Sequence, residues 1–141
     1  MRSNKPITYI LSVLLFLFVF VLIYLIGMAL YPYEPVRIDK FLISKNKVVV
    51  GEKLCFQFTG QKFYSVPVTV SIELTNGENY FVMSYDSNNP VGSVFKKRSL
   101  IIPYHVEAGK YRLRWTGVYQ MNPFNIVRRT VLSDAFEVEE E

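Results

Sequence analysis

Residues 66–74, VPVTVSIEL, decide how most of this chain folds. Valine, isoleucine and leucine alternate there with Pro, Thr, Ser and Glu, so every second side chain is apolar. This period of two predicts a β-strand with one buried face and one solvated face. Asn76-Gly77, a pair that tolerates positive φ, follows the stretch, and residues 79–84 resume as an apolar strand. The stretch therefore predicts two strands joined by a tight turn.

The same alternation continues on both sides of this pair. Upstream, Leu and Phe side chains at residues 54–58 alternate around Cys55 and Gln57, and downstream residues 110–115 read KYRLRW. No segment after residue 33 has a sustained helical period. The sequence predicts about seven strands, with a break at Gly51 left open: residues 36–43, 47–58, 66–74, 79–84, 94–102, 110–120 and 126–138. Short strands at this spacing favour an all-β antiparallel immunoglobulin-like sandwich.

Residues 101–115, IIPYHVEAGKYRLRW, resemble the E-to-F corner of bacterial and phage immunoglobulin-like domains. The resemblance implies a turn at Gly109 and a structural Tyr111, whose hydroxyl bonds back to the backbone. The whole layout also resembles small uncharacterised single-pass membrane proteins of phages and bacteria. The matching elements are residues 66–70, 88–92, 109–113 and 122–123. This resemblance implies a sandwich on a membrane anchor and carries no established activity.

An unbroken apolar run without charge covers residues 7–31. At about 1.5 Å per residue a helix there reaches about 37 Å, more than the hydrocarbon core of about 30 Å. Tyr31 and Tyr33 suit the aromatic belt of a membrane interface. A cleaved signal peptide is the alternative, because Gly27-Met28-Ala29 offers small residues, but a secretory apolar core usually has about 7–15 residues. The run therefore predicts a retained anchor that contacts the lipid bilayer.

The chain divides into five parts around this anchor. They are a basic tail (1–6), a transmembrane helix (7–31), a proline-containing spacer (32–37), the sandwich (38–138) and an acidic tail (139–141). A short tail with Arg2 and Lys5 resists crossing a membrane, whereas a long following domain translocates readily. We expect a bacterial inner-membrane protein with its N-terminus in the cytoplasm and its C-terminal domain periplasmic or extracellular.

Catalytic and metal-binding patterns are missing from the sequence. It has one histidine, His105, and one cysteine, Cys55, whereas a structural zinc site needs about four such ligands. It also lacks the nucleophile-elbow, phosphate-loop and paired-cysteine motifs. We expect no enzyme activity and no cofactor, with His105 as a solvated loop residue. We expect Cys55 to be a small buried hydrophobe.

Basic residues are the clearest surface feature. They cluster at residues 96–98, at Arg112 with Arg114, and at Arg128 with Arg129. If Tyr111 and Trp115 point into the core, Arg112 and Arg114 point outward, and pairing of the last two strands places all four arginines on one face. This face would suit anionic lipid, a carboxylate-bearing protein or another polyanion. An ordinary solvated face is the alternative, and no nucleic acid partner is expected.

The loop between the last two strands carries Tyr119 and Phe124. Exposed aromatic side chains on such a loop are typical of a protein-binding tip, although both rings could instead cap the open end of the core. We expect a non-enzymatic membrane protein that displays an interaction module to an unidentified protein partner. The alternative is a structural subunit of a virion or envelope assembly, and a homo-oligomer is left open.

Overall fold

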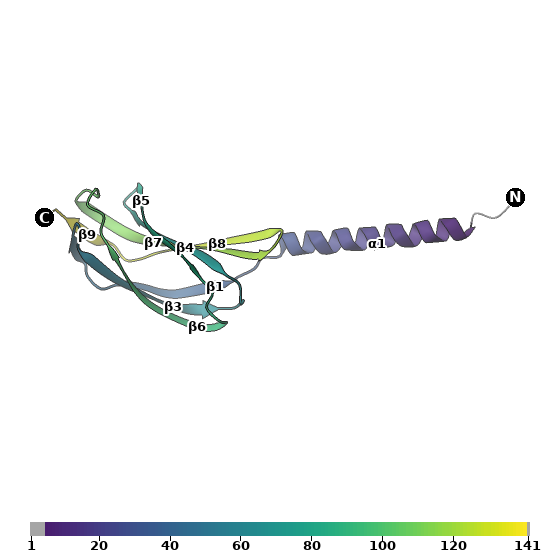
Figure 1. The fold of residues 1–141 in the computed structure, drawn as a ribbon, viewed down its shortest axis with the longest axis horizontal. Helices are drawn as coiled ribbons and strands as arrows, with labels where there is room; N and C mark the ends of the chain where they lie inside the picture. The colour runs from purple at the N-terminus through teal and green to yellow at the C-terminus, as the bar shows by residue number, and fades with distance from the viewer. Residues whose placement is uncertain (1–4, 141) are drawn as a thin grey trace.

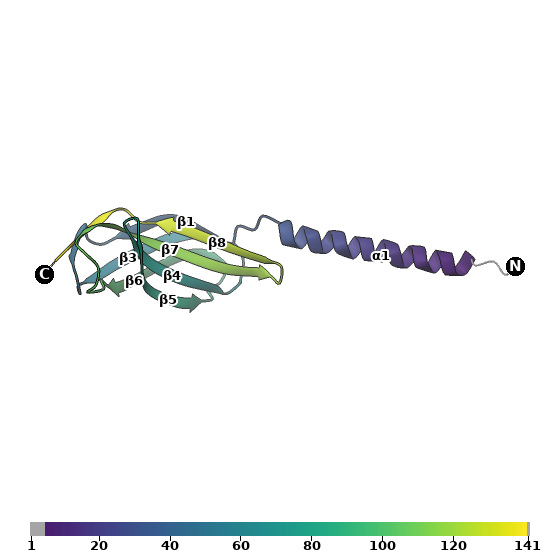
Figure 2. The same cartoon turned by 90° about the horizontal axis from the view of Figure 1, so that it is seen from above.

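The computed structural model describes residues 5–140, which form one helix and nine strands. The helix α1 (Lys5–Leu30) leaves one end of a β-sandwich, so the two chain ends lie at opposite ends of the molecule (Figures 1 and 2). Proline is tolerated in the first turn, where Pro6 lies. The helix ends before Pro32, which disfavours helical geometry at Tyr31. Of the expected basic tail, residues 1–4 lie outside the described part of the chain.

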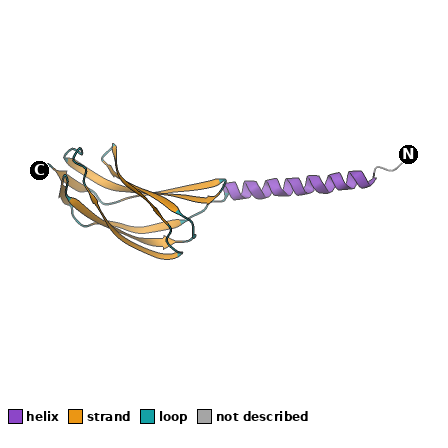
Figure 3. Ribbon diagram, viewed as in Figure 1, coloured by secondary structure: helices purple, strands orange, loops and turns teal. Residues whose placement is uncertain are grey.

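The strands form two sheets, which Figure 3 shows as the two layers of the sandwich. The smaller sheet has the order β1 (Val36–Ile43), β3 (Lys53–Lys62), β6 (Gly92–Ile101). The larger sheet has the order β2 (Lys47–Val49), β9 (Phe136–Glu139), β7 (Gly109–Asn122), β4 (Val68–Thr75), β5 (Asn79–Ser87), with β8 (Asn125–Leu132) also paired to β7. All pairings are antiparallel except β2 with β9. The prediction of an apolar helix followed by a β-sandwich is confirmed.

Two of the expected strand ranges each contain two strands. Residues 47–58 are divided at Gly51, which has a φ of 77° and lies so close to Tyr104 that an added Cβ would stand 2.5 Å from the ring. Residues 126–138 are divided at Ser133, whose hydroxyl accepts a 2.9 Å hydrogen bond from the Leu113 amide. After this break β9 takes over pairing with β7 from β8, and it also pairs with β2. The C-terminal segment thereby joins β2 to the larger sheet.

The strands extend beyond the range expected for the sandwich, residues 38–138, although β1 has the strand range 36–43 expected from the sequence. Strand β1 begins at Val36, within the expected spacer, because Val36 is buried and pairs with Lys62. The preceding residue is held as well, since the Phe63 amide donates a 2.9 Å hydrogen bond to the Pro35 carbonyl. At the other end Glu139 belongs to β9, and Lys47 donates a 2.6 Å hydrogen bond to its carboxylate.

The core lies between the sheets and includes the two residues that the sequence singled out as structural. Trp115 is only 3% exposed, and its ring centroid lies 5.9 Å from that of Phe58. Tyr111 is buried, and its hydroxyl donates a 2.9 Å hydrogen bond to the Glu107 carbonyl. This is the bond that the resemblance to immunoglobulin-like corners implied. Burial of each large apolar side chain contributes about 1.5–3 kcal/mol to folding.

Cys55 corrects one expectation about the core. Its neighbours in β3, Leu54 and Phe56, are fully buried, whereas Cys55 is half-buried. Successive side chains of a strand point to opposite faces, so Cys55 lies on the outer face of the smaller sheet. The prediction of a buried hydrophobe was wrong because residues 54–58 place Leu54, Phe56 and Phe58 in the core instead.

Candidate functional site

The outer face of the larger sheet carries three of the four expected arginines. Strand β7 buries its odd-numbered side chains, so Arg112 and Arg114 point outward. Arg128 pairs with the outward residue Val118 and lies on the same face. Arg114 is not free, because its Nε and Nη2 atoms donate to Glu73 Oε2 at 2.8 and 2.5 Å. The unpaired positive charge on this face is therefore smaller than the sequence indicated.

Arg129 does not share this face. It pairs with Gly117, which is buried and lies on the core side of β7, so the Arg129 side chain starts toward the inner side of the sandwich. Its Nη2 atom donates a 3.1 Å hydrogen bond to the Tyr33 carbonyl, in the segment that follows α1. The prediction that all four arginines lie together was wrong for Arg129, because it directly follows Arg128 in one strand.

The two aromatic residues near the β7–β8 turn have different environments. Tyr119 is 2% exposed and belongs to the core, whereas Phe124, in the turn itself, is 57% exposed. Burial raises the pKa of Tyr119, and the nearby Tyr85 raises it further. Tyr119 thus has the capping position that the sequence left open, and only Phe124 is available for contact.

The β7–β8 turn lies against the C-terminal end of α1 (Figures 1 and 2). Asn122 Nδ2 donates to the Met28 carbonyl at 3.1 Å. Asn125 Nδ2 donates to the Ala29 carbonyl at 2.9 Å and to the Tyr31 carbonyl at 3.1 Å. The last carbonyls of a helix have no partner within it. These two asparagines supply that partner and join the helix to the sandwich.

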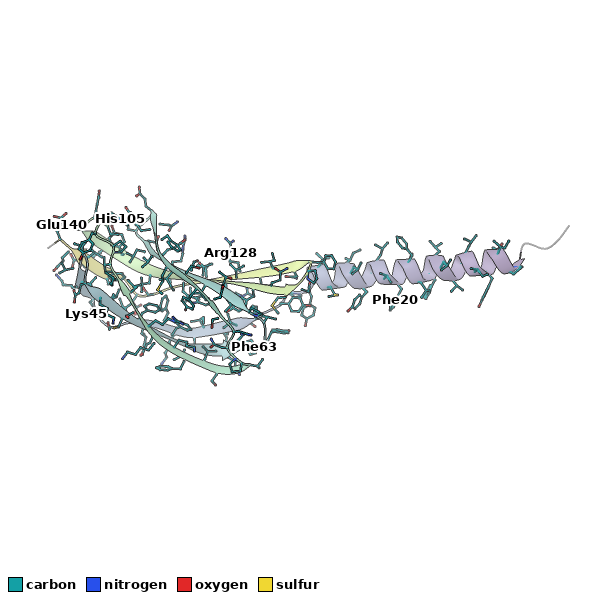
Figure 4. The ribbon with its side chains drawn as sticks, viewed as in Figure 1. Phe20, Lys45, Phe63, His105, Arg128 and Glu140 are labelled. Carbon is teal, nitrogen blue, oxygen red and sulfur yellow. The ribbon has the colours of Figure 1, made fainter. Side chains whose placement is uncertain are left out.

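Basic side chains also point between the sheets, on strand β6. Lys96 pairs with Phe58 and Arg98 with Phe56, two core residues of β3, so Lys96 and Arg98 share their inward face. Lys97, between them, points outward. Figure 4 shows the side chains of both layers, with Phe63 in the half of the sandwich nearer α1. The basic cluster at residues 96–98 is thus divided between two faces of one sheet.

A cavity of about 30 Å³ lies beside these inward cations. Its polar and aromatic lining comprises Phe58, Lys62, Tyr85, Ser87, Asn89, Lys96, Arg98, Trp115 and Tyr119, and no described lining residue is an acid. We call this the inter-sheet pocket. It combines three cations with a predominantly apolar wall, which is an unusual composition for the interior of a sandwich.

Lys62 is the most deeply buried of the three cations, with 3% of its surface exposed. Its Nζ atom donates to the Val66 carbonyl at 2.8 Å and to the Asn89 carbonyl at 2.7 Å. Desolvation lowers its pKa. Two carbonyls stabilise the ammonium group but supply no negative charge, so Lys62 adds to the positive potential of the pocket.

Arg98 and Tyr85 form the side of the pocket between β6 and β5. The guanidinium carbon of Arg98 lies 3.9 Å from the centre of the Tyr85 ring, a stacked cation–π arrangement. Burial raises the pKa of Tyr85, and Arg98 and the Trp115 indole partly offset this effect. The buried Trp115 indole N–H itself makes no hydrogen bond of ordinary geometry to any residue that the structure describes. A buried donor without an acceptor costs about 1–3 kcal/mol, which marks this wall of the pocket as incomplete.

The sequence reasoning missed the inter-sheet pocket, although one signal was present. Val94 and Leu100 are buried, and like the two cations they occupy even-numbered positions of β6, so all four side chains point to the same face. The apolar character of the first two predicts that Lys96 and Arg98 face inward with them. No sequence pattern predicts the buried Lys62, because one of the two carbonyls that hold it, that of Asn89, belongs to a loop far away in sequence.

Metal binding finds no support in the geometry. Among residues 5–140, no three His, Cys, Asp or Glu side chains are close enough together to hold a metal ion. His105 is exposed in the loop before β7, where its ring lies 6.1 Å from that of Tyr80. Figure 4 shows it at the end of the sandwich far from α1.

Comparison with known proteins supports the fold. No family model matches the chain, and no curated protein matches it in sequence. Among solved structures it is similar to the C-terminal domain of Wzt, with a TM-score of 0.54 and 12% identity over 77% of this chain and 75% of that one. It is also similar to the CARDB domain of PF1109 from Pyrococcus furiosus, with a TM-score of 0.41 and 15% identity over 75% of this chain and 97% of that one. At such identities the likeness to Wzt shows a β-sandwich fold alone.

Proposed function

We propose that this chain is a non-enzymatic, single-pass membrane protein that holds its sandwich at the bilayer surface as a binding module. The observation that carries the proposal is that α1 is both strongly apolar and uncovered by the sandwich. The stretch Pro6–Leu30 has a mean hydropathy of 3.0. The rest of the described chain buries none of the residues in its most apolar part. Residues of this kind favour mid-membrane positions by about 0.3–0.6 kcal/mol each.

The asparagine contacts support a retained anchor over a cleaved signal peptide. Signal-peptide cleavage after Ala29 would remove the Met28 and Ala29 carbonyls to which Asn122 and Asn125 donate. Four orphan carbonyls end every helix, and here part of that set is paired with the folded domain. These contacts between the sandwich and the helix end exist only if the helix stays attached, which supports a retained anchor.

The β7–β8 turn supports a position at the headgroups. Phe124 and Ile126 are exposed on this hairpin, which contacts the end of α1. Tyr31 and Tyr33, with ring centroids 4.6 Å apart, follow the helix directly. Aromatic side chains at the end of an apolar helix suit the membrane interface. We place the sandwich on the extracytoplasmic side of a bacterial inner membrane, because the N-terminal tail is short and basic.

The test uses the full chain with a C-terminal tag in a bacterial host. We expect it to stay in the membrane pellet after alkaline carbonate extraction, to have the mass of the uncleaved chain, and to lose its sandwich to protease added to spheroplasts. Phe18→Lys should weaken insertion because a lysine at the helix centre costs about 2.5–3.5 kcal/mol, whereas the matched Phe18→Ala should not. Release by carbonate, or a mass that lacks the residues up to Ala29, would refute the anchor.

A structural subunit of a virion or envelope assembly is the second candidate. The observation in its favour is that, among the described strands, β5 pairs only with β4 and β6 only with β3, so each sheet has an unpaired edge there. Such edges can pair with another chain. Chemical crosslinking and mass spectrometry of purified assemblies would support this role if the chain occurs there at a fixed stoichiometry. Absence from every such assembly would remove it.

A further inference from the structure

We propose that the inter-sheet pocket binds one oxyanion group, a phosphate or a carboxylate, at the end of a larger ligand. This inference goes beyond the proposed function and does not depend on the membrane anchor. It starts from the charges. Lys62, Lys96 and Arg98 all line the pocket, and no described lining residue carries a negative charge.

The cations of β6 have no anionic partner within the described chain. Their backbones belong to the β3–β6 ladder, but neither side chain makes an ion pair or a hydrogen bond to any residue among 5–140, and the Arg98 side chain lies over the ring face of Tyr85. Stacking on a ring occupies the face of a guanidinium group and leaves the N–H groups at its edge available. Inward cations without counter-ions are costly, and a bound anion would remove this cost.

The donors available for such an anion come from both sheets. Arg98 and Lys96 belong to the smaller sheet, and the indole N–H of Trp115 belongs to the larger one. That N–H is buried and makes no hydrogen bond of ordinary geometry to a described residue, although it interacts with the nearby Tyr85 hydroxyl, and Trp115 lines the same cavity. Hydrogen bonds to an ionised acceptor are about twice as strong as those between neutral groups. One oxyanion would give the indole N–H an acceptor of good geometry and would neutralise part of the charge.

The size of the cavity limits the ligand. Its volume of about 30 Å³ corresponds to roughly one water molecule, so it admits one oxygen atom of a phosphate or carboxylate and excludes a whole sugar ring or nucleotide. The pocket belongs to the part of the sandwich nearer α1, since Lys62 pairs with Val36, the first residue of β1. An oxyanion could therefore come from a lipid headgroup or from a soluble molecule near the membrane surface.

Trp115 makes the proposal testable, because it is the only tryptophan of the chain and lines the pocket. The full chain is purified in a maltoside detergent, which has no phosphate, and its fluorescence is followed during titration with inorganic phosphate or acetate. Sodium chloride at equal ionic strength is the reference. We expect a saturable change for phosphate or acetate that the chloride titration lacks.

Two variants separate the pocket from general charge effects. Arg98→Gln should weaken the apparent affinity about tenfold or more, since it removes a charge-assisted contact. Lys97→Gln removes the same charge from the outward neighbour and should leave the affinity unchanged. A thermal melt of each variant checks that it is folded. The proposal fails if the response to phosphate and acetate equals that to chloride, or if both variants weaken it equally. In that case Lys96 and Arg98 act only as inward charges that prevent another chain from pairing with the edge strand β6.

A second preparation, in phosphatidylcholine nanodiscs, identifies the source of the oxyanion. If the fluorescence already matches the saturated state and added phosphate changes nothing, while Arg98→Gln abolishes this state, a headgroup phosphate occupies the pocket. If the titration matches that in detergent, the ligand is soluble. Each result supports the pocket, and neither depends on whether the helix is retained in cells.

Discussion

The corner between β6 and β7 is stabilised by a hydrogen bond of a single side chain, that of Tyr111. Its buried hydroxyl donates to the Glu107 carbonyl at 2.9 Å, across the loop that precedes β7. Tyr111→Phe should lower the free energy of unfolding by about 1–2 kcal/mol, because it removes this bond while keeping the ring. Tyr104→Phe in the same loop is the matched control, since Tyr104 is 78% exposed. Urea denaturation of both variants measures the difference, and equal midpoints would show that the corner bond does not stabilise the fold.

The outer-face arginines also differ residue by residue. Arg114 is bound to Glu73, directly opposite it in β4, whereas Arg112 is exposed and faces Thr75. Arg114→Glu should cost about 1–2 kcal/mol of folding free energy, because it breaks a half-buried ion pair and sets two carboxylates side by side. Arg112→Glu should change it by less than about 0.5 kcal/mol. Arg112→Glu is thus the clean test of whether this face binds a partner, and an equal cost for both variants would contradict the ion-pair assignment.

At the scale of elements, the β7–β8 hairpin determines how α1 meets the sandwich. Asn122 and Asn125 reach the helix end, and β8 contacts α1 directly. Replacing both asparagines with alanine should leave the sandwich folded but increase hydrogen exchange of the last helical turn. The physical reason is that these side chains connect two elements that share few other contacts. The measurement is hydrogen–deuterium exchange of the full chain in nanodiscs.

The control for this variant is Asn88→Ala, an exposed asparagine in the β5–β6 connection with no side-chain hydrogen bond to a described residue. It should not change exchange at the helix end. Unchanged exchange in the double variant as well would mean that the hairpin contacts do not hold the helix.

At the scale of the whole molecule, buried tyrosines predict how stability depends on pH. Burial raises the pKa of Tyr85, Tyr111 and Tyr119 in the folded state. In the unfolded chain these groups titrate at about pH 10. Their contribution to stability is therefore fully present below about pH 10 and is lost as the pH rises above it, by up to about 1.4 kcal/mol per pH unit for each tyrosine.

Tyr119→Phe should reduce this alkaline loss, because it removes one titrating group that makes no hydrogen bond through its hydroxyl to a described residue. Tyr104→Phe, at an exposed position, should leave the slope unchanged. Lys62 acts in the opposite direction: its pKa is lowered by burial, so stability rises with pH between that pKa and the value of 10.5. Since Lys62 is present in both variants, the difference between their urea midpoints across alkaline pH isolates Tyr119. Equal slopes would show that Tyr119 is not protected in the folded state.

Local patterns were sufficient for the architecture. The charge-free run of α1 and the alternation around β4 predicted an apolar helix and a β-sandwich, because helix length and strand period depend only on neighbouring residues. The turn at Asn76-Gly77 was equally local, and Gly77 has the positive φ of 113° that such a turn requires. Strand alternation also placed Trp115 in the core correctly. The expectations for Cys55 and Arg129 were wrong because they did not follow this rule, which places Cys55 opposite Leu54 and Phe56, and Arg129 opposite Arg128.

Only the tertiary structure decided which distant groups meet. The Asn89 carbonyl that helps to hold Lys62, the carboxylate that neutralises Arg114 and the asparagines that reach α1 all lie far away in sequence from their partners. Such contacts arise when two sheets pack and close their edges, and no window of sequence encodes their pairing. The sequence by itself thus determined the elements of this protein and its apolar helix. Packing decided that Lys62, Lys96 and Arg98 line one pocket and that one hairpin binds the helix end, because both depend on how whole sheets are aligned.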